Sequence, residues 1–481
     1  MTNRATVVIS GRGRHGEGIA SHQGKDIYVP QALLGETLEV AIGAPFAPNS
    51  KRCPGTILKI ITPSPYRVTP EEQARVCPHY ARCGGCQLTH VSPEGQLAYK
   101  RADIVAALSA VVAPKQADLL VRPVVPTTQR PCRFKSIRYA APRNPNRLSP
   151  LVLGFYAAGS HDLVPVTKCP LEPERFGVVA AALEQALNEL ALPCYDEVQA
   201  VATQGAKRAA AVRALQLRLG DDNAVSACLI MAGRLNEAQR STLRATAHAL
   251  GLESLTVGYN DQVGNALFTR DLELIAGSAA ISKTLLGAHF AVYPNTFLQV
   301  NYEICTKLYQ AAIEHCAKAQ TQQRALDLCC GVGTMTLALA QHFEQVLGVE
   351  IVADAIAAAQ ANARANGLSA RCDFRAADIT QVLPKLIYEQ KQARKLGRDD
   401  QLISAIIADP ARVGLGVANA QLLAQIPGPC QLALIFCALP ALKRDLPPLL
   451  QGGFSIDYVQ GFDMFPGSQH VETLVCLSKA R

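Results

Sequence analysis

One stretch, residues 326–350, limits what this chain can fold into more than any other part of the sequence. The apolar run at 326–328 leads into a turn with Gly331 and Gly333, a helical pattern follows, and a second apolar run ends at Glu350. This order is typical of an α/β domain that binds a cofactor. The glycines let the cofactor lie against bare backbone at the start of the helix, and the acid, about 20 residues on, accepts both ribose hydroxyls.

The number of glycines indicates which kind of cofactor to expect. A turn that holds a pyrophosphate usually has three glycines, whereas only Gly331 and Gly333 stand here. S-adenosylmethionine (SAM), which has no phosphates, therefore fits the turn better than NAD. A glycine turn also occurs in α/β proteins of other kinds, and that alternative stays open at this point.

Length and charge set the broad class. With 481 residues the chain is long enough for two to four domains. The net charge is +8, but residues 1–170 hold 21 Lys and Arg against 10 Asp and Glu, so the remaining residues carry −3. An uneven positive surplus predicts a polyanionic partner, most commonly nucleic acid, and a solvated basic surface is the alternative.

The sequence also predicts a compartment. The N-terminal residues lack the basic and then apolar run of a signal peptide, and no apolar segment reaches the ~18 residues that a membrane helix needs. We therefore expect a cytoplasmic protein with no membrane partner. In that compartment the 16 cysteines stay reduced, so clustered cysteines are expected to bind metal or to catalyse.

Residues 1–65 alternate short β-rich runs with turns, which predicts a small five-stranded barrel. The Gly-Arg-Gly turn at 11–13, with Val-Pro at 29–30 and Leu-Gly-Glu-Thr at 34–37, resembles a TRAM domain, an OB-like RNA-binding module. The resemblance implies that Arg12, Arg14 and Lys25 contact phosphates. For each of them a solvated loop charge is the alternative.

Three cysteines, Cys77, Cys83 and Cys86, lie within ten residues in a loop rich in glycine. Thiols this close together predict a metal centre completed by a fourth cysteine, for which Cys169 is the candidate. Zinc is the general interpretation of such a cluster. The five-residue first spacing, the two-residue second spacing and the distant fourth thiol are more typical of a 4Fe-4S cluster.

Between these thiols, cations and aromatic residues alternate over residues 130–139, with Arg133, Phe134 and Lys135 at the centre. On a strand this pattern can place charges on phosphates and rings on unstacked bases, which predicts contact with single-stranded RNA. An ordinary amphipathic strand is the alternative. A helix over 175–192 and strands at 215–219, 224–231 and 255–257 are predicted to form a scaffold.

From residue 286 onward, the pattern predicts alternating strands and helices. We expect a helix from 297 to about 315, a helix over 353–365 that stops at Gly367, and strands starting at 372 and spanning 403–408 and 432–436. In a parallel sheet, functional side chains gather at the carboxyl ends of strands. Glu350, Asp378, Asp409 and Cys437 all fall at such ends.

The order of these motifs resembles the RNA (uracil-C5)-methyltransferases, in particular the TRAM-bearing, iron–sulfur branch that methylates 23S rRNA. Besides the front module, the cysteines and the glycine loop, the resemblance includes Phe-Leu-Gln-Val-Asn at 297–301, Asp-Pro-Ala-Arg at 409–412 and residues 463–472. It implies that Cys437 is the nucleophile and Glu472 the general base. The residues implied to contact SAM are Gln299, Cys329, Gly331, Gly333, Thr334, Glu350, Asp378 and Asp409.

The chemistry explains why these residue types are needed. C5 of uracil is too weak a nucleophile to take a sulfonium methyl group, but a thiolate that adds at C6 creates an enolate whose C5 can attack. A carboxylate then removes the C5 proton, and the thiol leaves. A free thiol is only a few per cent ionised near pH 7, so we expect a cation, Arg412 or Arg444, to lower the pKa of Cys437.

This chain departs from the family pattern at three places. Cys437 is followed by Ala-Leu-Pro-Ala at 438–441, where the family usually has Asn-Pro-Ala-Thr, so an asparagine that could orient the uracil is absent. Cys329 and Cys132 stand where aromatic residues are usual, which weakens stacking.

The sequence as a whole predicts a multidomain protein. Residues 1–65 form the OB-like TRAM barrel, 66–285 a central α+β RNA-binding domain with the iron–sulfur cluster, and 286–481 an α/β Rossmann-like SAM methyltransferase domain. Part of 94–124 is expected to pack on the last domain. The same chemistry on tRNA and a catalytically silent RNA-binding or ribosome-assembly factor are the alternatives. A radical-SAM methylthiotransferase fits less well, because those enzymes typically have a shorter first cysteine spacing.

Overall fold

The computed structural model describes residues 3–13, 16–143, 150–197, 201, 209–264 and 266–480. The chain divides into two compact units. Unit 1 consists of Met1–Lys100, Tyr156–His161 and Phe465–His470, and unit 2 of Arg101–Phe155, Asp162–Met464 and Val471–Arg481. Within the described residues, none of the helices has the length and apolar character needed to cross a membrane.

Unit 1 begins with a mixed sheet of six strands in the order β1-β5-β6-β4-β3-β2. The strands are β1 (Asn3–Val8), β2 (Gly11–Arg12), β3 (Gly18–His22), β4 (Lys25–Val29), β5 (Thr37–Ile42) and β6 (Arg52–Thr62). Alternate side chains of β1 and β5, among them Val7 and Val40, are buried in one core, as in a sheet with one solvated face. The sheet has six strands instead of the expected five. Its assignment to an OB-like TRAM barrel stays a prediction.

Two helices flank the cysteine-rich loop. α1 (Pro70–Val76) starts with a capping box, in which Glu72 N donates to Thr69 Oγ1 at 3.2 Å and Thr69 N donates to Glu72 Oε2 at 3.0 Å. It ends at Cys77, and α2 (Pro93–Leu108) begins beyond the loop. Gly84 N donates to the carbonyl oxygen of Tyr156 at 2.9 Å, which fixes the loop against residues 156–161 of the same unit.

Unit 2 contains an eight-stranded sheet in the order β19-β18-β17-β20-β21-β23-β22-β7. Its strands are β7 (Val121–Val125), β17 (Arg324–Leu328), β18 (Gln345–Glu350), β19 (Cys372–Ala376), β20 (Ile403–Ala408), β21 (Cys430–Phe436), β22 (Phe454–Phe462) and β23 (Glu472–Lys479). Strands β17 to β21 are parallel, and β23 is antiparallel to both of its neighbours. The strand order reverses between β17 and β20, which is where ligands bind in open α/β sheets.

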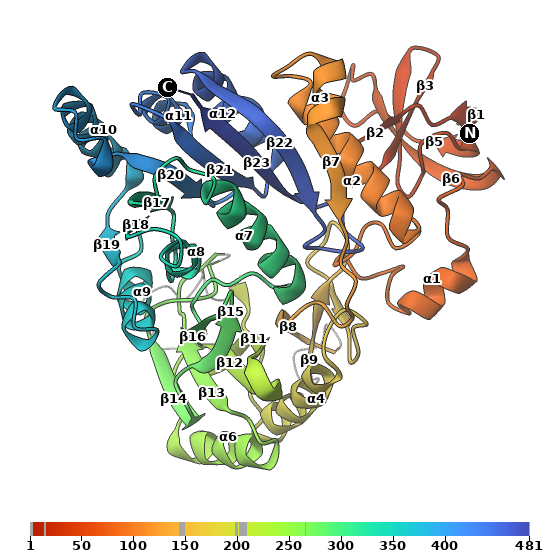
Figure 1. Ribbon diagram of the computed structural model, residues 1–481. Helices are drawn as coiled ribbons and strands as arrows, with labels where there is room; N and C mark the ends of the chain where they lie inside the picture. Colours follow the sequence, from red (N-terminus) through yellow and green to blue (C-terminus); the bar gives the residue numbers. More distant parts are fainter. Residues whose placement is uncertain are drawn as a thin grey trace. The chain divides into compact units, whose positions relative to one another are not determined.

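Helices cover both faces of this sheet (Figure 1). On one face are α7 (Tyr302–Cys316), α8 (Thr334–Leu339) and α9 (Ala353–Ala365), and on the other α10 (Ile379–Lys395), α11 (Val417–Leu423) and α12 (Leu439–Gln451). The remaining short elements are α3 (Pro114–Leu120), η1 (Asp221–Asn223) and η2 (Asp399–Gln401). Because helices cover both sides, β20 and β21 are almost entirely buried and apolar.

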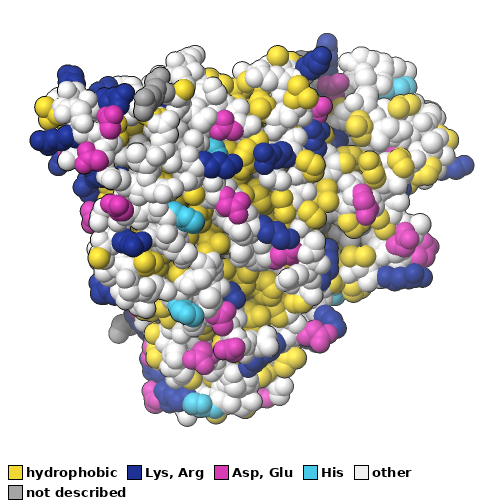
Figure 2. Space-filling view, in the orientation of Figure 1, with side chains coloured by type: hydrophobic (Ala, Val, Ile, Leu, Met, Phe, Trp, Pro, Cys, Tyr) yellow, Lys and Arg dark blue, Asp and Glu magenta, His cyan; other side chains and the backbone are white. Residues whose placement is uncertain are grey.

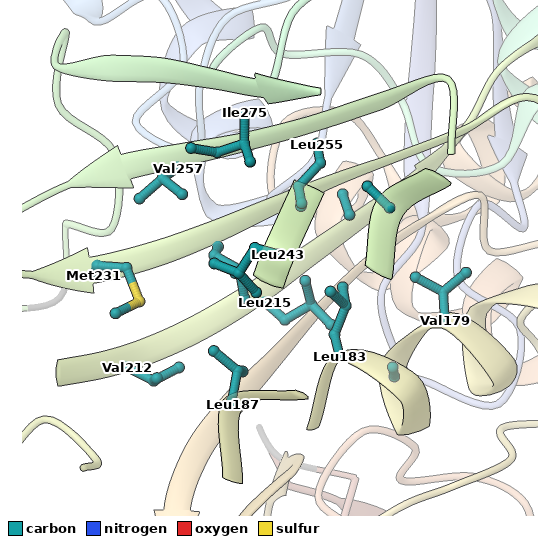
Figure 3. Close-up of a cluster of buried hydrophobic side chains, with 14 of the residues drawn as sticks. Val179, Leu183, Leu187, Val212, Leu215, Met231, Leu243, Leu255, Val257 and Ile275 are labelled. Carbon is teal, nitrogen blue, oxygen red and sulfur yellow. The ribbon is translucent and has the colours of Figure 1, made fainter. Parts of the chain in front are cut away.

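A second sheet in unit 2 has the order β10-β9-β8-β11-β12-β13-β14. Its strands are β8 (Lys135–Pro142), β9 (Leu151–Tyr156), β10 (Leu163–Pro165), β11 (Ala211–Leu219), β12 (Val225–Ala232), β13 (Ser254–Tyr259) and β14 (Leu272–Gly277). Against one face lie α4 (Glu174–Glu189) and α6 (Glu237–Ala249), and Leu183, Leu215 and Leu243 meet in the core between them (Figure 3). A hairpin of β15 (Ile281–Leu285) and β16 (Ala288–Val292) follows.

The structure confirms most of the elements predicted in the second half of the chain. Helix α9 has the expected bounds, with Gly367 in the left-handed conformation just beyond its end, and β20 also has the expected bounds. The helix predicted from residue 297 begins later, at Tyr302, because the Asn301 side chain accepts from Ile304 N and caps it there.

Candidate active site

The glycine turn between β17 and α8 leaves backbone open to a ligand. Gly331 has φ of +54°, and a Cβ there would have no atom within 4 Å. Gly333 has φ of +86°, and a Cβ there would meet Ala359 and Leu337 at 3.2 Å. Gly331 is therefore a place for a ligand to approach, whereas Gly333 lets α8 pack closely, as in nucleoside-binding turns.

Glu350, at the end of β18, is held beside this turn. Gly331 N donates to its Oε2 at 3.2 Å, and Val352 N donates to its Oε1 at 3.0 Å. Asp378 lies at the end of the next strand, where it accepts from Thr380 N and Thr380 Oγ1, both at 2.8 Å, and caps α10. These hydrogen bonds lower the pKa of Asp378, so it is a carboxylate at neutral pH.

Cys329 follows the last residue of β17, in the turn that leads to Gly331. It has φ of +62°, which is uncommon for a residue other than glycine. Burial raises the pKa of its thiol to about 12, and the charges of Glu350, Asp327, Asp409 and Asp378 add to that effect. The thiol is therefore neutral at pH 7, and these acids raise its pKa in the same direction as burial does.

Asp409, at the end of β20, has partners from other elements. Tyr309 Oη on α7 donates to Asp409 Oδ2 at 3.0 Å, and the Gln299 side chain also forms a hydrogen bond to it. Burial raises the pKa of Asp409 to about 6, and these hydrogen bonds limit the rise. Tyr309 is not part of any motif in the sequence. Its position on the inner face of the predicted helix was the only available signal.

Cys437 lies at the carboxyl end of β21, half-buried, just before α12. Burial raises the pKa of its thiol to about 11, and the carboxyl groups of Glu472 and Asp409 raise it further, whereas Arg412 lowers it. The expected lowering of this pKa is therefore wrong for the free chain, because burial and two acids outweigh one cation. Arg444, the other expected cation, donates from Nε to Asp445 Oδ1 at 2.7 Å and from Nη2 to the carbonyl oxygen of Val413.

Glu472 is the first residue of β23 and is 3% exposed. Among the residues that the structure describes, its Oε2 has no hydrogen-bond partner. Burial raises its pKa to about 8, Asp409 raises it further and Arg412 lowers it. Glu472 is therefore mostly protonated at neutral pH in the free chain.

These contacts join two groups of side chains. Glu350 accepts from Gly331 N of the glycine turn, and Asp409 N donates to the carbonyl oxygen of Leu328 at 3.4 Å, just before that turn. Phe436 of β21 pairs with Thr473 of β23, so Cys437 and Glu472 lie at adjacent strand ends, and β21 also lies next to β20, which leads to Asp409. Asp409 thus belongs to both groups, and a thiol, a protonated carboxyl and a cofactor turn share one site in unit 2. The open backbone at Gly331 and the fixed acid after β18 fit the nucleoside part of SAM.

The predicted metal ligands are not gathered in this way. Cys77, Cys83 and Cys86 belong to unit 1, and Cys169 belongs to unit 2. Within the described parts of both units, no group of three or more His, Cys, Asp or Glu side chains is arranged to hold a metal ion. The structure therefore does not support the predicted 4Fe-4S cluster. One local feature suits a thiolate: Gly85 N donates to Cys83 Sγ at 3.4 Å.

The residues predicted to contact RNA are spread over both units. In unit 1 the Arg12 guanidinium lies 4.3 Å from the centroid of the Tyr99 ring, Lys25 is exposed, and Arg14 lies outside the described residues. In unit 2 the Phe134 ring stacks on Tyr302 with a centroid distance of 4.9 Å, so one of its faces is already covered. Arg133 and Lys135 are both half-buried.

Comparisons with known proteins identify the family of this chain. A family model described as tRNA (uracil-5-)-methyltransferase matches residues 223–480. An uncharacterized RNA methyltransferase of Clostridium tetani is 29% identical over 471 residues, which cover 98% of this chain and 95% of that protein. Another, from Halalkalibacterium halodurans, is 29% identical over 469 residues, which cover 96% of this chain and 94% of that protein.

A solved structure shares the fold. The Pyrococcus abyssi tRNA (uracil-54, C5)-methyltransferase in complex with S-adenosyl-L-homocysteine superposes with a TM-score of 0.71 at 21% identity and covers 98% of this chain. The match also covers 99% of the Pyrococcus abyssi chain. Since the family model spans more than half of the sequence, this chain belongs to the tRNA (uracil-5-)-methyltransferase family of SAM-dependent RNA methyltransferases.

Proposed function

We propose that this protein transfers the methyl group of SAM to C5 of one uridine in 23S rRNA, with Cys437 as nucleophile and Glu472 as general base. One observation carries the proposal: the pairing of Phe436 with Thr473 sets Cys437 and Glu472 at adjacent strand ends, and Asp409 follows the neighbouring strand β20, beside the residue that leads into the cofactor turn. The thiol adding to C6 and the carboxyl accepting the C5 proton must both reach one pyrimidine ring.

The order of proton movements follows from the pKa values. SAM, when bound, supplies an electrophilic methyl group. Cys437 must lose its proton before it forms a bond to C6, and an ionised Glu472 opposes that loss. A protonated Glu472 therefore favours the first step, in which the Cys437 proton goes to solvent. Glu472 must then release its own proton to solvent before it accepts the C5 proton, and the electron pair of the C5–H bond restores the C5–C6 double bond as the Cys437 thiolate leaves. Arg412 lowers the pKa of both groups, so it assists both changes.

The substrate is proposed on less direct grounds. The resemblance to the 23S rRNA branch and the basic surplus in residues 1–170 support rRNA. Basic and acidic side chains are interspersed on the visible face (Figure 2), so charge does not mark one RNA-binding patch there. The family description and the Pyrococcus abyssi relative, which acts on uracil-54 of tRNA, support tRNA as the alternative. We place the protein in the cytoplasm.

Methylation of RNA from cells that lack the gene tests the substrate. With labelled SAM, we expect label in 23S rRNA, located by mapping 5-methyluridine, and none in tRNA. Label in tRNA alone would establish the alternative substrate. If neither RNA is labelled while SAM still binds, the alternative hypothesis of a catalytically silent RNA-binding or ribosome-assembly factor is supported. That reading is motivated by Ala438, which caps α12 without a side-chain hydrogen bond and stands where the family has asparagine.

We also propose the 4Fe-4S cluster, which rests on the spacing of Cys77, Cys83, Cys86 and Cys169 alone. Protein purified without oxygen is expected to contain about four iron and four sulfide ions per chain, and Cys86→Ser to lose them. Cys53→Ser removes a buried thiol outside the loop and serves as the control. Zinc in place of iron, or no metal at all, would show that the proposed cluster is wrong.

A further inference from the structure

In the second sheet of unit 2, one face packs on helices α4 and α6 (Figure 3). In the described part of the chain, no such pair of helices covers the opposite face. On the face opposite to that core, an apolar cluster that includes Ala214 and Cys228 fills the middle. Beyond it, at the start of β8, Lys135 lies directly across from Arg218 of β11. Two cations therefore occupy neighbouring positions on the same face.

Among the described residues, neither cation has an acidic partner. Arg218 is 2% exposed, and its Nη2 donates only to backbone, to the carbonyl oxygens of Pro294 at 3.4 Å and of Thr296. Its Nε is buried without a hydrogen-bond partner in the described part of the chain. Neither Lys135 nor Arg218 forms an ion pair with a described residue. The acid of this region, Asp221, is held by Lys283 at 2.7 Å and by Thr284.

This arrangement is unfavourable in the free protein. Like charges directly across a sheet repel, and the two carbonyl oxygens bonded to Arg218 replace only part of the hydration that its buried guanidinium loses. Burial and the charge of Arg218 accordingly lower the pKa of Lys135 to about 7. The other titratable groups around Arg218 are Tyr302 of α7 and Cys228 of β12, both neutral at pH 7. A bound anion would supply the missing charge.

The pair lies next to the segment that leads to the active site. Arg218 holds the carbonyl oxygens of Pro294 and Thr296, and the Gln216 side chain also donates to Pro294 at 2.8 Å. In the same segment Phe297 is 69% exposed, and the Gln299 side chain reaches Asp409. A ligand held by Lys135 and Arg218 would therefore be close to the chain that carries one wall of the catalytic site.

We propose that Lys135 and Arg218 form a binding site for one phosphate group of the substrate RNA, beside the nucleotide that enters the active site. The inference rests on the proposed function, in which the substrate is RNA. A phosphodiester oxygen accepts hydrogen bonds from an ammonium and from a guanidinium, and it offers the single negative charge that this pair lacks. The carboxylate of SAM has similar chemistry, so the test must separate the two sources.

The test measures RNA and S-adenosylhomocysteine affinity for Lys135→Gln, with Lys135→Arg as rescue. We expect Lys135→Gln to weaken RNA binding about tenfold at low salt and to reduce the slope of log affinity against log salt by about 0.7, as for one lost contact to single-stranded RNA. Affinity for S-adenosylhomocysteine is expected to stay unchanged. Lys385→Gln, which removes a side chain 73% exposed on α10, is the matched control.

Two further readouts distinguish an anion site from a structural role. Lys135→Gln is expected to leave the unfolding temperature unchanged or higher, because it removes a repulsion. Wild-type RNA affinity is expected to fall from about pH 6 to about pH 8 as Lys135 loses its proton, whereas Lys135→Arg stays nearly flat over this range. Arg218→Lys keeps the charge and is expected to bind RNA more weakly, because one fork of donors is lost.

Several results would overturn the inference. If Lys135→Gln binds and methylates RNA like the wild type, with an unchanged salt slope, the phosphate site is wrong although the proposed function stands. Loss of S-adenosylhomocysteine affinity would assign the anion to the cofactor instead. Equal loss of stability in the Gln and Arg variants would show a structural role. A wild-type protein that methylates no RNA would refute the proposed function itself, and the inference with it.

Discussion

Replacing Cys437 by alanine is expected to reduce methyl transfer to RNA by at least about 10⁴-fold, because the covalent step at C6 has no substitute in the site. Binding of S-adenosylhomocysteine should be unchanged, since the cofactor turn lies on β17 and α8. The measurement is transfer of labelled methyl groups to RNA under single-turnover conditions. With RNA that contains 5-fluorouridine, the wild type is expected to form a stable covalent adduct and the variant none.

Cys194 provides a matched control for this experiment. Its thiol is half-buried, and burial raises its pKa to about 11, the same value as for Cys437. It lies beside β11 rather than at the end of a catalytic strand. Cys194→Ser is therefore expected to keep full activity and to form the adduct. Activity of Cys437→Ala within about tenfold of the wild type would remove Cys437 from the mechanism.

Replacing Glu472 by glutamine is expected to separate the two halves of the reaction. The thiol can still add and C5 can still be methylated, but removal of the C5 proton loses its base, which slows turnover about 10³-fold. A methylated RNA joined covalently to Cys437 should therefore accumulate and be visible on a denaturing gel. Glu389→Gln, on the exposed surface of α10, is the control and should release product normally. Free methylated product at the wild-type rate would exclude Glu472 as the base.

The same substitution is expected to stabilise the protein at neutral pH. The pKa of Glu472 rises from 4.5 to about 8 on folding, so between these values the unfolded chain has released a proton that the folded chain keeps. Stability contributed by this group is full below about pH 4.5 and declines as pH rises to about 8. Glu472→Gln lacks this decline and should gain about 3 kcal/mol at pH 7, measured by denaturant unfolding. A lower free energy of unfolding for Glu472→Gln at pH 7 would contradict the conclusion that burial raises the pKa of Glu472.

The part of the fold with regular local patterns could be predicted from sequence. Helix α9 and strand β20 have the expected bounds, because a glycine stop after α9 and an uninterrupted apolar run in β20 are local signals. The strand-end positions of Glu350, Asp409 and Cys437 follow from the same alternation of strands and helices. The TRAM assignment rests on resemblance, the metal cluster on the spacing of the cysteines, and the choice of RNA on resemblance and the basic surplus of residues 1–170. All three stay predictions.

Other features of the site depend on contacts between residues distant in the sequence. Tyr309 becomes relevant only because α7 places its hydroxyl 3.0 Å from Asp409. The pairing of Arg218 with Lys135 depends on the register of β11 against β8, which no local pattern specifies. The pKa of Cys437 was expected to fall, and the error has a physical cause. Sequence shows which charges exist, but the burial that dominates the shift follows from packing.

The placement of β7 has a consequence for how this molecule is made. Val121 of β7 pairs with Val459 of β22, and Gln460 Nε2 donates to the carbonyl oxygen of Pro123, 337 positions away along the chain, at 3.3 Å. During synthesis, almost the whole polypeptide must therefore be completed before β7 can pair with β22. Contacts between residues this far apart in the sequence form slowly. A fragment that starts at residue 286 would lack β7 and would leave backbone hydrogen-bonding groups of β22 unpaired at the edge of the sheet. Such an exposed edge promotes aggregation. Recombinant catalytic fragments should retain residues 121–125.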